Sequence, residues 1–208
     1  MLKVSLLILF SYLVGSIPTG YLVGRLKGVD LRMLGSGNVG ATNVARILGI
    51  RAAIFILFFD MAKGAMVIYL VSLLANWQFF SFSPERIEFL RVSVGLAAIC
   101  GHIFTPFLEF RGGKGVATLT GVLIGLAPMP MIIILPVFLT IVILTRFVSV
   151  GSIVGALLLP ILMCILKQGP IITLFGGIAG ILIIIRHIPN IRRLLSNTEY
   201  RFGERINP

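Results

Sequence analysis

The chain is dominated by long apolar stretches that contain almost no charged residues. They fall near residues 4–24, 52–75, 89–107, 116–128, 130–145, 147–166 and 170–186. A helix needs about 20 predominantly apolar residues to cross the hydrocarbon core of a bilayer. In lipid only helices and closed barrels satisfy every backbone polar group, and apolar stretches of this length are typical of helices. The sequence therefore predicts an all-α, polytopic membrane helix bundle with about seven transmembrane helices, formed by residues 1–208 as a single integral membrane domain.

Composition agrees with a membrane protein and argues against a nucleic-acid partner. Hydrophobic residues make up 58% of the chain and charged residues only 12%, whereas soluble domains carry about 25% charged residues. The net charge is +11, but the Lys and Arg residues lie between the apolar stretches rather than in one basic run. Membrane orientation and phosphate binding both account for this placement, so we expect no nucleic-acid binding.

The stretch from Val116 to Thr145 leaves two interpretations open. It is long enough for one tilted helix, but Pro128 and Pro130 favour a tight turn between two short helices. With seven spans and the N-terminus outside, most Lys and Arg residues lie on the inner side, as the positive-inside rule requires. We therefore predict seven spans, an outside N-terminus and a cytoplasmic C-terminus. The first apolar stretch is expected to remain as a helix, because it lacks the cleavage site of a signal peptide.

Several polar residues inside the apolar stretches are assigned to packing rather than to chemistry. Cys100 and Cys164 lack the spacing of metal ligands and of a disulfide pair. Asp60 and Lys63 lie three residues apart on one helix face, where mutual pairing is favoured over a proton relay. His102 is interpreted as a satisfied residue near the end of the third helix. No metal and no cofactor are expected.

The first polar loop reads Ser36-Gly-Asn-Val-Gly-Ala-Thr-Asn43 and is followed by Arg46. Its glycines permit a positive φ, which turns successive backbone N–H groups inward, and its Ser, Asn and Thr side chains add directional hydrogen bonds. Such a loop can wrap an anion. An ordinary Asn- and Gly-rich turn is the alternative.

A second polar loop, Arg111-Gly-Gly-Lys-Gly-Val-Ala-Thr118, runs directly into an apolar helix. Its backbone donors and the positive end of that helix would face the same place, an arrangement that holds phosphate in many proteins. It is not a Walker A motif, because the GxxxxGK[ST] spacing and a preceding strand are absent. A basic cytoplasmic turn of the kind that topology alone supplies is the alternative.

A third polar cluster begins where the last apolar stretch ends. It comprises Arg186, His187, Pro189, Asn190, Arg192 and Arg193, followed in the tail by Glu199 and Glu204. A histidine at a helix end often interacts only with the helix dipole. Asn190 lies three residues after His187, so both side chains can reach one cleft at headgroup level.

Together, SGNVGATN with Arg46, the RGGKGVAT loop, and HIPNIRRL with the trailing Gly203-Glu204 resemble the three signature motifs of the acyl-phosphate:glycerol-3-phosphate acyltransferase family, known as PlsY. The resemblance covers essentially the whole chain, including DMAKG on the second helix. It implies a bacterial inner-membrane enzyme with a cytoplasmic active site. That enzyme would transfer a fatty acyl group from acyl phosphate to the 1-hydroxyl of sn-glycerol 3-phosphate, giving lysophosphatidic acid and phosphate in the first acylation step of phospholipid synthesis.

The resemblance also implies site residues and partners. The catalytic group is expected to be Ser36, Arg46, Lys114, His187 and Asn190. The substrate-binding group is expected to be Gly37, Asn38, Gly40, Thr42, Asn43, Gly112, Gly113, Gly115 and Glu204. The partners expected are glycerol 3-phosphate, acyl phosphate, membrane lipid and other phospholipid-synthesis enzymes.

We expect different site residues to bind different parts of the two substrates. Arg46 and Lys114 would hold the glycerol 3-phosphate dianion, while Ser36, His187 and Asn190 fix its hydroxyls and phosphate. The backbone from Gly112 to Gly115 would receive the acyl-phosphate headgroup. Acyl phosphate has a good leaving group, so no acyl-enzyme is required. Either His187 or the phosphate of the substrate can accept the proton of the attacking hydroxyl.

Other functions fit the residues less well. A transporter of an anionic phosphorylated metabolite is the main alternative, but it should place its polar groups near the midplane of the membrane. A phosphatidyltransferase that uses a CDP-lipid needs several aspartates around a metal, and Asp30 and Asp60 lie far apart in the sequence. The thioester-using class of glycerol-phosphate acyltransferases carries HxxxxD, which neither histidine provides.

Overall fold

The computed structural model describes residues 2–77, 79 and 82–206, and within these ranges it contains helices and no strand. The helices are α1 Leu2–Ser16, α2 Thr19–Leu26, α3 Ala41–Ile47, α4 Ile50–Asn76, α5 Pro84–Ile103, α6 Val116–Leu126, α7 Pro128–Thr145, α8 Val148–Ile165, α9 Pro170–Arg186 and α10 Ile188–Leu195. Two short 3-10 helices, η1 Leu31–Met33 and η2 Pro106–Leu108, lie in the connections. The all-α prediction is confirmed.

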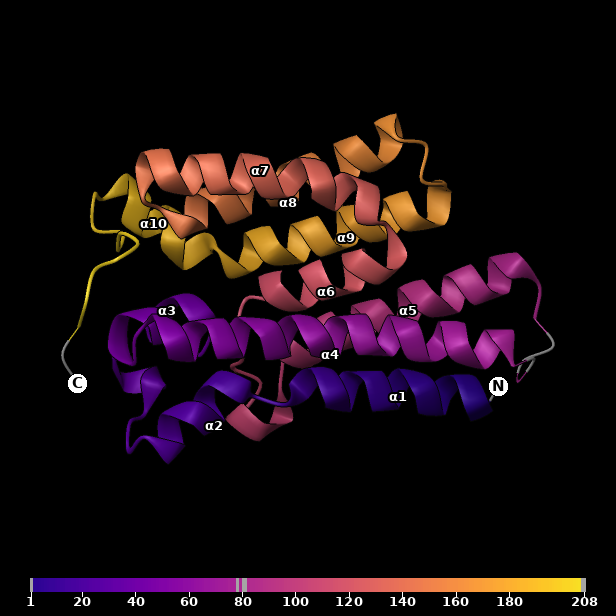
Figure 1. Ribbon diagram of the computed structural model, residues 1–208, viewed down its shortest axis with the longest axis horizontal. Coiled ribbons are helices and arrows are strands. Elements are labelled where there is room, and N and C mark those ends of the chain that lie inside the picture. Colours follow the sequence, from indigo (N-terminus) through magenta and orange to yellow (C-terminus); the bar gives the residue numbers. More distant parts are fainter. Residues whose placement is uncertain (1, 78, 80–81, 207–208) are drawn as a thin grey trace.

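The long helices form an elongated bundle of two groups (Figure 1). The helices α1, α4 and α5 pack together on one side and α7, α8 and α9 on the other, while α6 lies between the groups against α4. The start of α1 and the C-terminal tail lie at opposite ends of the bundle. We call the end that carries the tail, α3 and α10 the tail end.

Every predicted apolar stretch corresponds to a helix. Among the described residues five segments are long and apolar enough to cross a membrane: Leu2–Leu26, Ile50–Asn76, Pro84–Leu108, Pro128–Thr145 and Val148–Ile165. A sixth is α9 followed by α10, bent by 52°. The remaining stretch, α6, has 11 residues. The number of spans and the orientation of the N-terminus stay predictions.

The stretch from Val116 to Thr145 forms two helices, as the prolines predicted. The turn is made by Ala127, whose φ of −151° and ψ of 76° are not helical, and α7 begins at Pro128. The side chain of Arg91 on α5 donates to the carbonyl oxygen of Gly125 in the last turn of α6. This contact provides a partner for a backbone acceptor that the helix itself cannot satisfy.

The first apolar stretch is interrupted, which the sequence analysis did not predict. The helix α1 ends at Ser16 and α2 begins at Thr19, with Ile17 and Pro18 between them. Proline has no backbone N–H and its ring crowds the preceding turn, so the helix breaks there. The break leaves backbone carbonyl groups without helical partners, and side chains satisfy them. Thr105 donates to Ser16 O, and Lys63 donates to Ile17 O.

Close backbone contacts hold the bundle together. A methyl group at Gly64 would fall on the backbone oxygen of Thr118, and one at Gly121 would fall on that of Met61. The helices α4 and α6 therefore approach as closely as glycine allows, the mode of packing that small residues permit in membranes.

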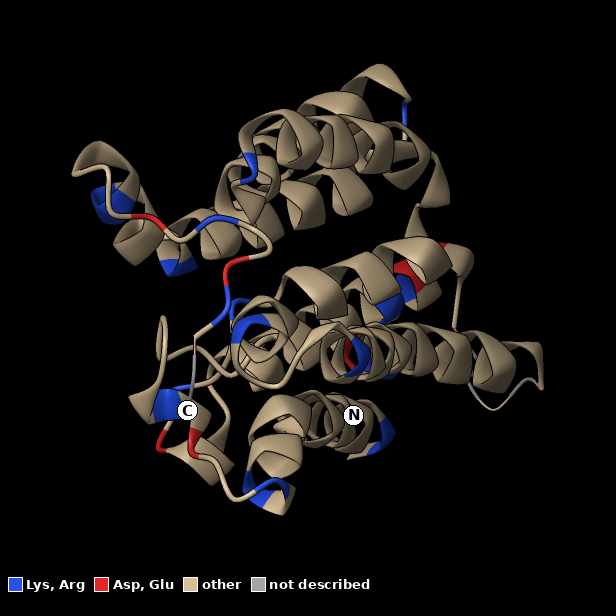
Figure 2. Ribbon diagram, turned by 60° about the vertical axis from the view of Figure 1, so that its left-hand side comes forward, with Lys and Arg blue, Asp and Glu red and all other residues tan. Residues whose placement is uncertain are grey.

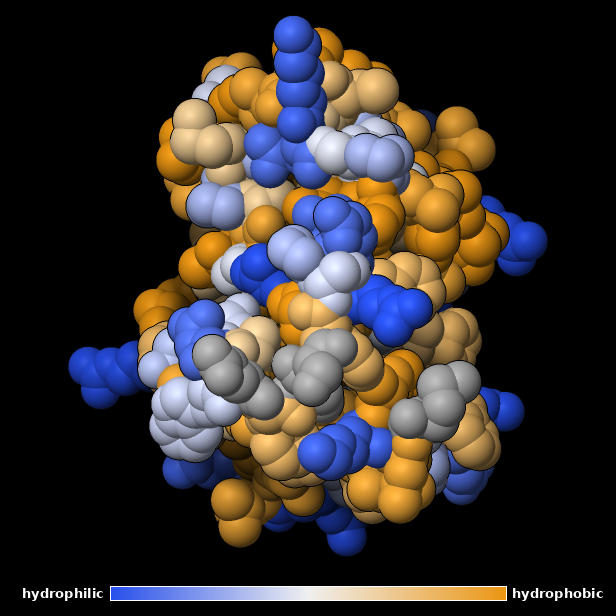
Figure 3. Space-filling model, turned by 90° about the vertical axis from the view of Figure 1, so that its right-hand side faces the viewer, coloured by the Kyte–Doolittle hydropathy of each residue, from blue (hydrophilic) through white to orange (hydrophobic). Residues whose placement is uncertain are grey.

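Charged and apolar residues are unevenly distributed over the surface of the molecule, as expected for a helix bundle that spans a membrane. Figure 2 shows many of the Lys and Arg residues on the tail end of the molecule. Figure 3 views the opposite end, where hydrophilic side chains run from the top through the middle of the face and also lie at its edges, with apolar side chains between them. The helix α7 presents its apolar residues outward, and only 11% of its span is buried within the bundle. Such a surface is typical of contact with lipid.

Candidate functional site

A cavity of about 610 Å³ opens at the tail end and continues between α4, α6 and α7. Its polar part is lined by Ser36, Asn38, Thr42, Asn43, Arg46, Lys114, Ser149, His187, Asn190 and Glu199. Its apolar part is lined by side chains such as Ile54, Leu57, Met61, Ile124, Met131, Leu135 and Phe138. One continuous space therefore joins a charged region to a hydrocarbon-like region.

Most of the predicted site residues line this cavity. They are Ser36, Asn38, Gly40, Thr42, Asn43, Arg46, Lys114, Gly115, His187 and Asn190. The predicted convergence of three separate polar segments is confirmed. The residues that do not line it are Gly37, Gly112, Gly113 and Glu204. Two of these, Gly112 and Gly113, line a separate hollow of about 10 Å³ instead.

The first polar loop, residues 35–43, is organised by the side chain of Asn43. The side-chain oxygen of Asn43 accepts the N–H of Ser36 at 3.0 Å, and its nitrogen donates to Leu31 O at 3.3 Å and to Leu34 O at 3.1 Å. The residue is 2% exposed. The structure thus gives Asn43 a role in holding the loop, while its predicted contact with substrate stays a prediction.

Arg46 supplies a buried cation at the same end of the cavity. One of its terminal nitrogens donates to Tyr200 O at 3.4 Å, and the guanidinium lies 5.0 Å from the centre of the Tyr200 ring. Its Nε has no hydrogen-bond partner within the described ranges. Burial lowers the pKa of Arg46, and the nearby Glu199 and Glu204 act in the opposite direction. A charged group with an unused donor beside a cavity is suited to an anion.

The second polar loop, residues 111–115, is held by backbone hydrogen bonds rather than presented to the cavity. The N–H of Gly112 donates to Ile103 O at 3.0 Å, and that of Gly113 donates to His102 O at 3.1 Å. From the other side, Arg186 donates to Gly112 O at 3.0 Å and to Gly113 O at 3.3 Å. The expectation that the amides of Gly112 and Gly113 receive a phosphate is therefore corrected, because both are already used within the chain.

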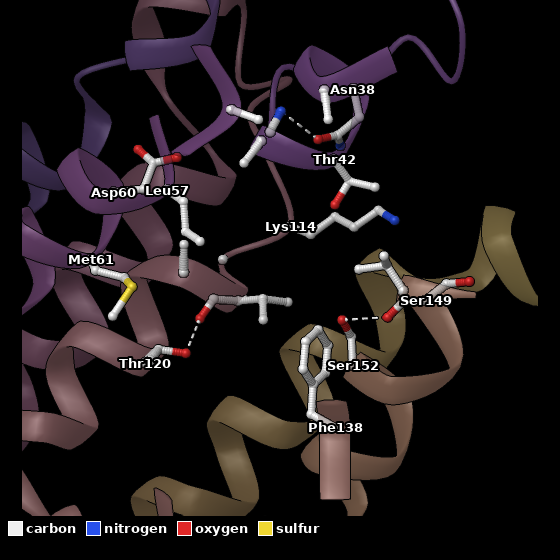
Figure 4. Close-up of a pocket in the computed structure, with 18 of the residues that line it drawn as sticks. Asn38, Thr42, Leu57, Asp60, Met61, Lys114, Thr120, Phe138, Ser149 and Ser152 are labelled. Carbon is white, nitrogen blue, oxygen red and sulfur yellow. Dashed lines mark hydrogen bonds between the residues drawn. The ribbon is translucent and has the colours of Figure 1, made fainter. Parts of the chain in front are cut away.

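Lys114 is the side chain that the second loop contributes. In Figure 4 its ammonium group points across the cavity towards α8, where Ser149 lies, and away from Asp60. Burial lowers the pKa of Lys114 to about 8; the Glu199 carboxylate raises it, and the cations of Arg193, Arg46 and Arg186 lower it further. The first turn of α6, which follows Gly115, also faces the cavity, so its unpaired N–H groups add positive potential there.

His187 occupies the bend between α9 and α10 and is 1% exposed. Its Nδ1 lies 2.8 Å from Ile183 O, so Nδ1 carries the proton and Nε2 keeps a free lone pair. Burial lowers the pKa of His187 to about 4, and the positive charge of Lys114 acts in the same direction. At neutral pH the imidazole is therefore uncharged and able to accept a hydrogen bond.

Glu199 is the acidic residue that lines the polar part of the cavity. The residue predicted from the sequence was Glu204, and its contact with substrate stays a prediction. The Oε1 of Glu199 accepts from Asn190 at 2.6 Å and from Ser149 at 2.9 Å, and its Oε2 accepts from Arg193 at 2.7 Å. Burial alone would raise the pKa of Glu199, but these hydrogen bonds lower it, so the carboxyl is ionised. Glu204, by contrast, is exposed and accepts the backbone N–H of Arg201 outside the cavity lining.

Asn190 is left with one unused group after this contact. Its nitrogen donates to Glu199, while its buried side-chain oxygen has no hydrogen-bond partner in the described part of the chain. Because the nitrogen is already committed, the orientation of the amide is fixed and the oxygen is available as an acceptor. A hydroxyl group in the cavity would satisfy it.

The C-terminal tail connects the two sides of the polar end of the cavity. On one side, the hydroxyl of Tyr200 donates to Gly35 O at 3.2 Å, and the N–H of Ile206 donates to Arg46 O at 3.1 Å. On the other side, the backbone of Phe202 exchanges hydrogen bonds with Arg146 in the turn between α7 and α8. No signal in the sequence indicated this connection, because it depends on segments far apart in the chain.

Three other cavity residues also lacked a functional signal in the sequence. Ser149 is one of several serines within an apolar stretch, while Asp60 and His102 were interpreted as packing residues. The Asp60–Lys63 pairing is confirmed, with 2.8 Å between the charged atoms. Among the described residues no group of three or more His, Cys, Asp and Glu side chains is arranged to hold a metal ion.

Comparisons with known proteins agree on one family. The family model for glycerol-3-phosphate acyltransferase matches residues 5–197. A glycerol-3-phosphate acyltransferase of Crocosphaera subtropica is 47% identical over 97% of this chain and 95% of its own, and one of Geobacter sulfurreducens is 41% identical over 97% and 99%.

Solved structures show the same likeness in three dimensions. A crystal structure of PlsY (YgiH), an integral membrane glycerol 3-phosphate acyltransferase, in its glycerol 3-phosphate form, superposes with a TM-score of 0.86 at 36% identity. Its lysophosphatidic acid form superposes with a TM-score of 0.83 at 35% identity. Each comparison covers 97% of this chain and 96% of the other.

Proposed function

Because the chain belongs to the glycerol-3-phosphate acyltransferase family, we propose that it transfers a fatty acyl group from acyl phosphate to the 1-hydroxyl of sn-glycerol 3-phosphate. The products are 1-acylglycerol 3-phosphate (lysophosphatidic acid) and inorganic phosphate. One observation carries this proposal: a single cavity joins the buried Arg46 and the half-buried Lys114 to an apolar space between α4, α6 and α7. Two phosphorylated substrates, one of which bears a hydrocarbon chain, have complementary chemistry.

The acceptor substrate binds at the basic end of the cavity. Arg46 and Lys114 hold the phosphate dianion by charge-assisted hydrogen bonds. The unused Nε of Arg46 and the unused oxygen of Asn190 are a donor and an acceptor that a glycerol phosphate can satisfy together. Ser36 lines the same region and supplies a further hydroxyl.

The donor substrate lies with its acyl chain in the apolar part of the cavity. Leu57 and Met61 of α4 face this space together with Phe138 of α7 (Figure 4). The phosphate of the donor lies beside Lys114 and the first turn of α6, whose N–H groups favour an anion. The carbonyl carbon between chain and phosphate then lies at the boundary of the two regions, where the glycerol hydroxyl also lies.

The reaction needs alignment more than a covalent intermediate. The oxygen of the 1-hydroxyl forms a bond to the acyl carbonyl carbon, and the bond from that carbon to the phosphate oxygen breaks. The phosphate leaves with the electron pair, and Lys114 stabilises the charge that develops on it. The hydroxyl proton passes either to His187 Nε2 or to a phosphate of the substrates. The pKa of about 4 for His187 favours the phosphate, since a phosphate monoester has a second pKa of about 6, and leaves His187 to position the hydroxyl.

The location of the enzyme in the membrane brings its product close to the enzymes that use it. The protein is an integral membrane protein. We infer that it lies in the bacterial cytoplasmic membrane with the tail end facing the cytoplasm, because the basic side chains gather at that end. Lysophosphatidic acid formed there enters the inner leaflet and passes to other enzymes of phospholipid synthesis.

A donor assay with the purified protein tests the proposal. The enzyme in lipid or detergent is supplied with glycerol 3-phosphate and either palmitoyl phosphate or palmitoyl-CoA, and inorganic phosphate and lysophosphatidic acid are both measured. We expect equal amounts of the two products from palmitoyl phosphate and neither from the thioester. Activity with palmitoyl-CoA alone would overturn the assignment of the donor. Lys114→Met should remove most of the activity, while Lys27→Met, which changes an exposed lysine outside the cavity lining, serves as the matched control.

A further inference from the structure

Three ionisable side chains that the proposed reaction does not use lie together within the membrane-spanning helices. Asp60 and Lys63 of α4 form an ion pair, and His102 Nδ1 of α5 lies 3.7 Å from the same oxygen of Asp60 that faces Lys63. The side chains of Asp60, Lys63 and His102 are 4%, 7% and 9% exposed. We call these three residues the α4–α5 charge cluster. Ionisable groups inside a membrane are costly and usually have a function.

The ring of His102 connects this cluster to the loop before Lys114. A methyl group added at Gly113 would fall on His102 Nε2, so the backbone of Gly113 lies directly against the ring. The main chains of the same two segments are also paired, since Gly113 N–H donates to His102 O. The loop and the ring therefore cannot move independently.

The loop is held equally firmly from its other side. The guanidinium of Arg186 on α9 donates to the carbonyl oxygens of both Gly112 and Gly113. The two glycines thus lie between α5 and α9 with their amides and carbonyls engaged. Lys114 is the next residue, so any displacement of the loop is passed directly to the ammonium group in the cavity.

Asp60 connects the His102 ring to Lys63, which is itself held by the backbone. Lys63 Nζ is fixed at the break between α1 and α2, where it donates to Ile17 O at 3.1 Å. Asp60 Oδ1 lies between that ammonium and the ring, 2.8 Å from Lys63 Nζ, and accepts no well-formed hydrogen bond within residues 2–77, 79 and 82–206. Its negative charge favours the tautomer of the ring that carries the proton on Nδ1, and thereby favours one orientation of the ring.

There is little space into which the ring could turn. Asp60 and His102 form part of the wall between the cavity and the hollow of about 10 Å³ that Thr105, Gly112 and Gly113 also line. A space of that size holds at most about one water molecule. On the side of the hollow the ring therefore has almost no free space.

From these contacts we propose that Asp60 and His102 are positioning residues for acyl transfer: Asp60 orients the His102 ring, and the ring fixes the loop that places Lys114 against the phosphate of glycerol 3-phosphate. The inference rests on the proposed function, which assigns Lys114 to that phosphate. A cluster that served stability alone would change how much protein is folded without changing its affinity for substrate.

Two substitutions of His102 separate the ring from its polar edge. His102→Phe keeps a ring against Gly113 but removes the nitrogen that faces Asp60, whereas His102→Asn keeps a polar group and removes the outer part of the ring. In both variants we expect the KM for glycerol 3-phosphate to rise about tenfold, because small misplacements of a binding group have large effects. The KM for acyl phosphate should rise as well, because the phosphate of the donor also lies beside Lys114.

Val94→Ala is the matched control, because Val94 lies fully buried on the same helix in the core cluster. It should lower the melting temperature without changing either KM. If the His102 variants behaved in the same way, with lower stability and unchanged KM, the positioning role would be refuted.

A double-mutant cycle tests whether the cluster acts through Lys114. Binding of glycerol 3-phosphate is measured by calorimetry for wild type, Asp60→Asn, Lys114→Met and the double variant. Asp60→Asn should weaken binding about tenfold in the wild-type background and not at all when Lys114 is already absent. Equal losses in both backgrounds would overturn the proposal. This measurement needs no acyl donor, so an enzyme that binds glycerol 3-phosphate but fails to use acyl phosphate would refute the proposed donor alone.

Asp60→Glu provides a second test if the His102 variants do not fold. It keeps the charge that Lys63 requires, but its side chain is longer by one methylene group, so the carboxylate cannot keep the same position relative to the ring. The same rise in KM for glycerol 3-phosphate is expected, and an unchanged KM in this folded variant would contradict the inference.

Discussion

The two glycine-rich loops at the polar end of the cavity resemble each other in sequence but are built differently. The loop of residues 35–43 is organised from within, by the Asn43 side chain and by Asn38, whose oxygen accepts the N–H of Gly40 at 2.8 Å. The loop of residues 111–115 is held from outside, by the backbone of α5 and by Arg186. In the first loop polar side chains shape the backbone, whereas in the second glycine is required because a neighbouring backbone occupies the space of a side chain.

The largest expected effect comes from adding a methyl group to the second loop. In Gly112→Ala the new Cβ would fall on the backbone oxygen of His102, which cannot move without displacing α5. Overpacking of this kind costs about 3 kcal/mol or more, and we expect a loss of acyl transfer of about 100-fold or more, measured as kcat/KM. Gly177→Ala is the control, since a Cβ there meets nothing within 4 Å. Near-normal activity of Gly112→Ala would show that the loop is not held as described.

A smaller loss is expected from the first loop, where two matched substitutions can be compared. Asn43→Asp keeps the acceptor for Ser36 N–H but replaces the donor to Leu31 O and Leu34 O with a charge, at a cost of about 2–3 kcal/mol. Asn38→Asp keeps the one side-chain hydrogen bond that Asn38 makes within the described residues, in which it accepts the N–H of Gly40, and should cost less than about 1 kcal/mol. Thermal unfolding in detergent measures both. Equal destabilisation by the two would refute the central role of Asn43.

The side chain that the second loop presents predicts a pH dependence. Lys114 has a pKa lowered to about 8 by burial, and a bound phosphate dianion raises it again. Affinity for glycerol 3-phosphate should therefore be highest near pH 7, where Lys114 is charged and the phosphate is still a dianion, and should fall above pH 8 by up to about tenfold per pH unit. Lys114→Arg should make the KM independent of pH over this range, because arginine stays charged. A KM for the wild type that is constant between pH 7 and pH 9.5 would contradict the prediction.

The smallest effect is expected at His187, which faces both loops across the cavity. If His187 positions the hydroxyl, His187→Gln should keep a hydrogen bond and lower kcat by less than about tenfold. The acid limb of the pH–rate profile, set by the substrate phosphate, should then remain in the variant. A loss of about 100-fold together with the disappearance of the acid limb would instead support His187 as the general base.

Much of the fold could be predicted because membrane insertion depends on local properties. Each of the seven apolar stretches is helical, the first as the two helices α1 and α2, and the pair of prolines correctly divided residues 116–145 into α6 and α7. The break at Pro18 was not predicted, although a proline in a helix is itself a local signal. It can be tolerated inside the bundle because Lys63 and Thr105 satisfy the exposed carbonyl groups, and these partners come from α4 and the end of α5.

The sequence by itself determined that this chain is a membrane helix bundle with three polar segments suited to phosphate, because hydropathy, glycine content and charge order are properties of short stretches. Only the tertiary structure decided which groups in those segments face the cavity. Glu199 rather than Glu204 holds Asn190, and the amides of Gly112 and Gly113 serve α5 instead of a ligand. Each of these contacts depends on a partner that is distant in the chain or on the direction in which a backbone group points. The type of a residue does not reveal which of its possible partners the packed helices bring within reach.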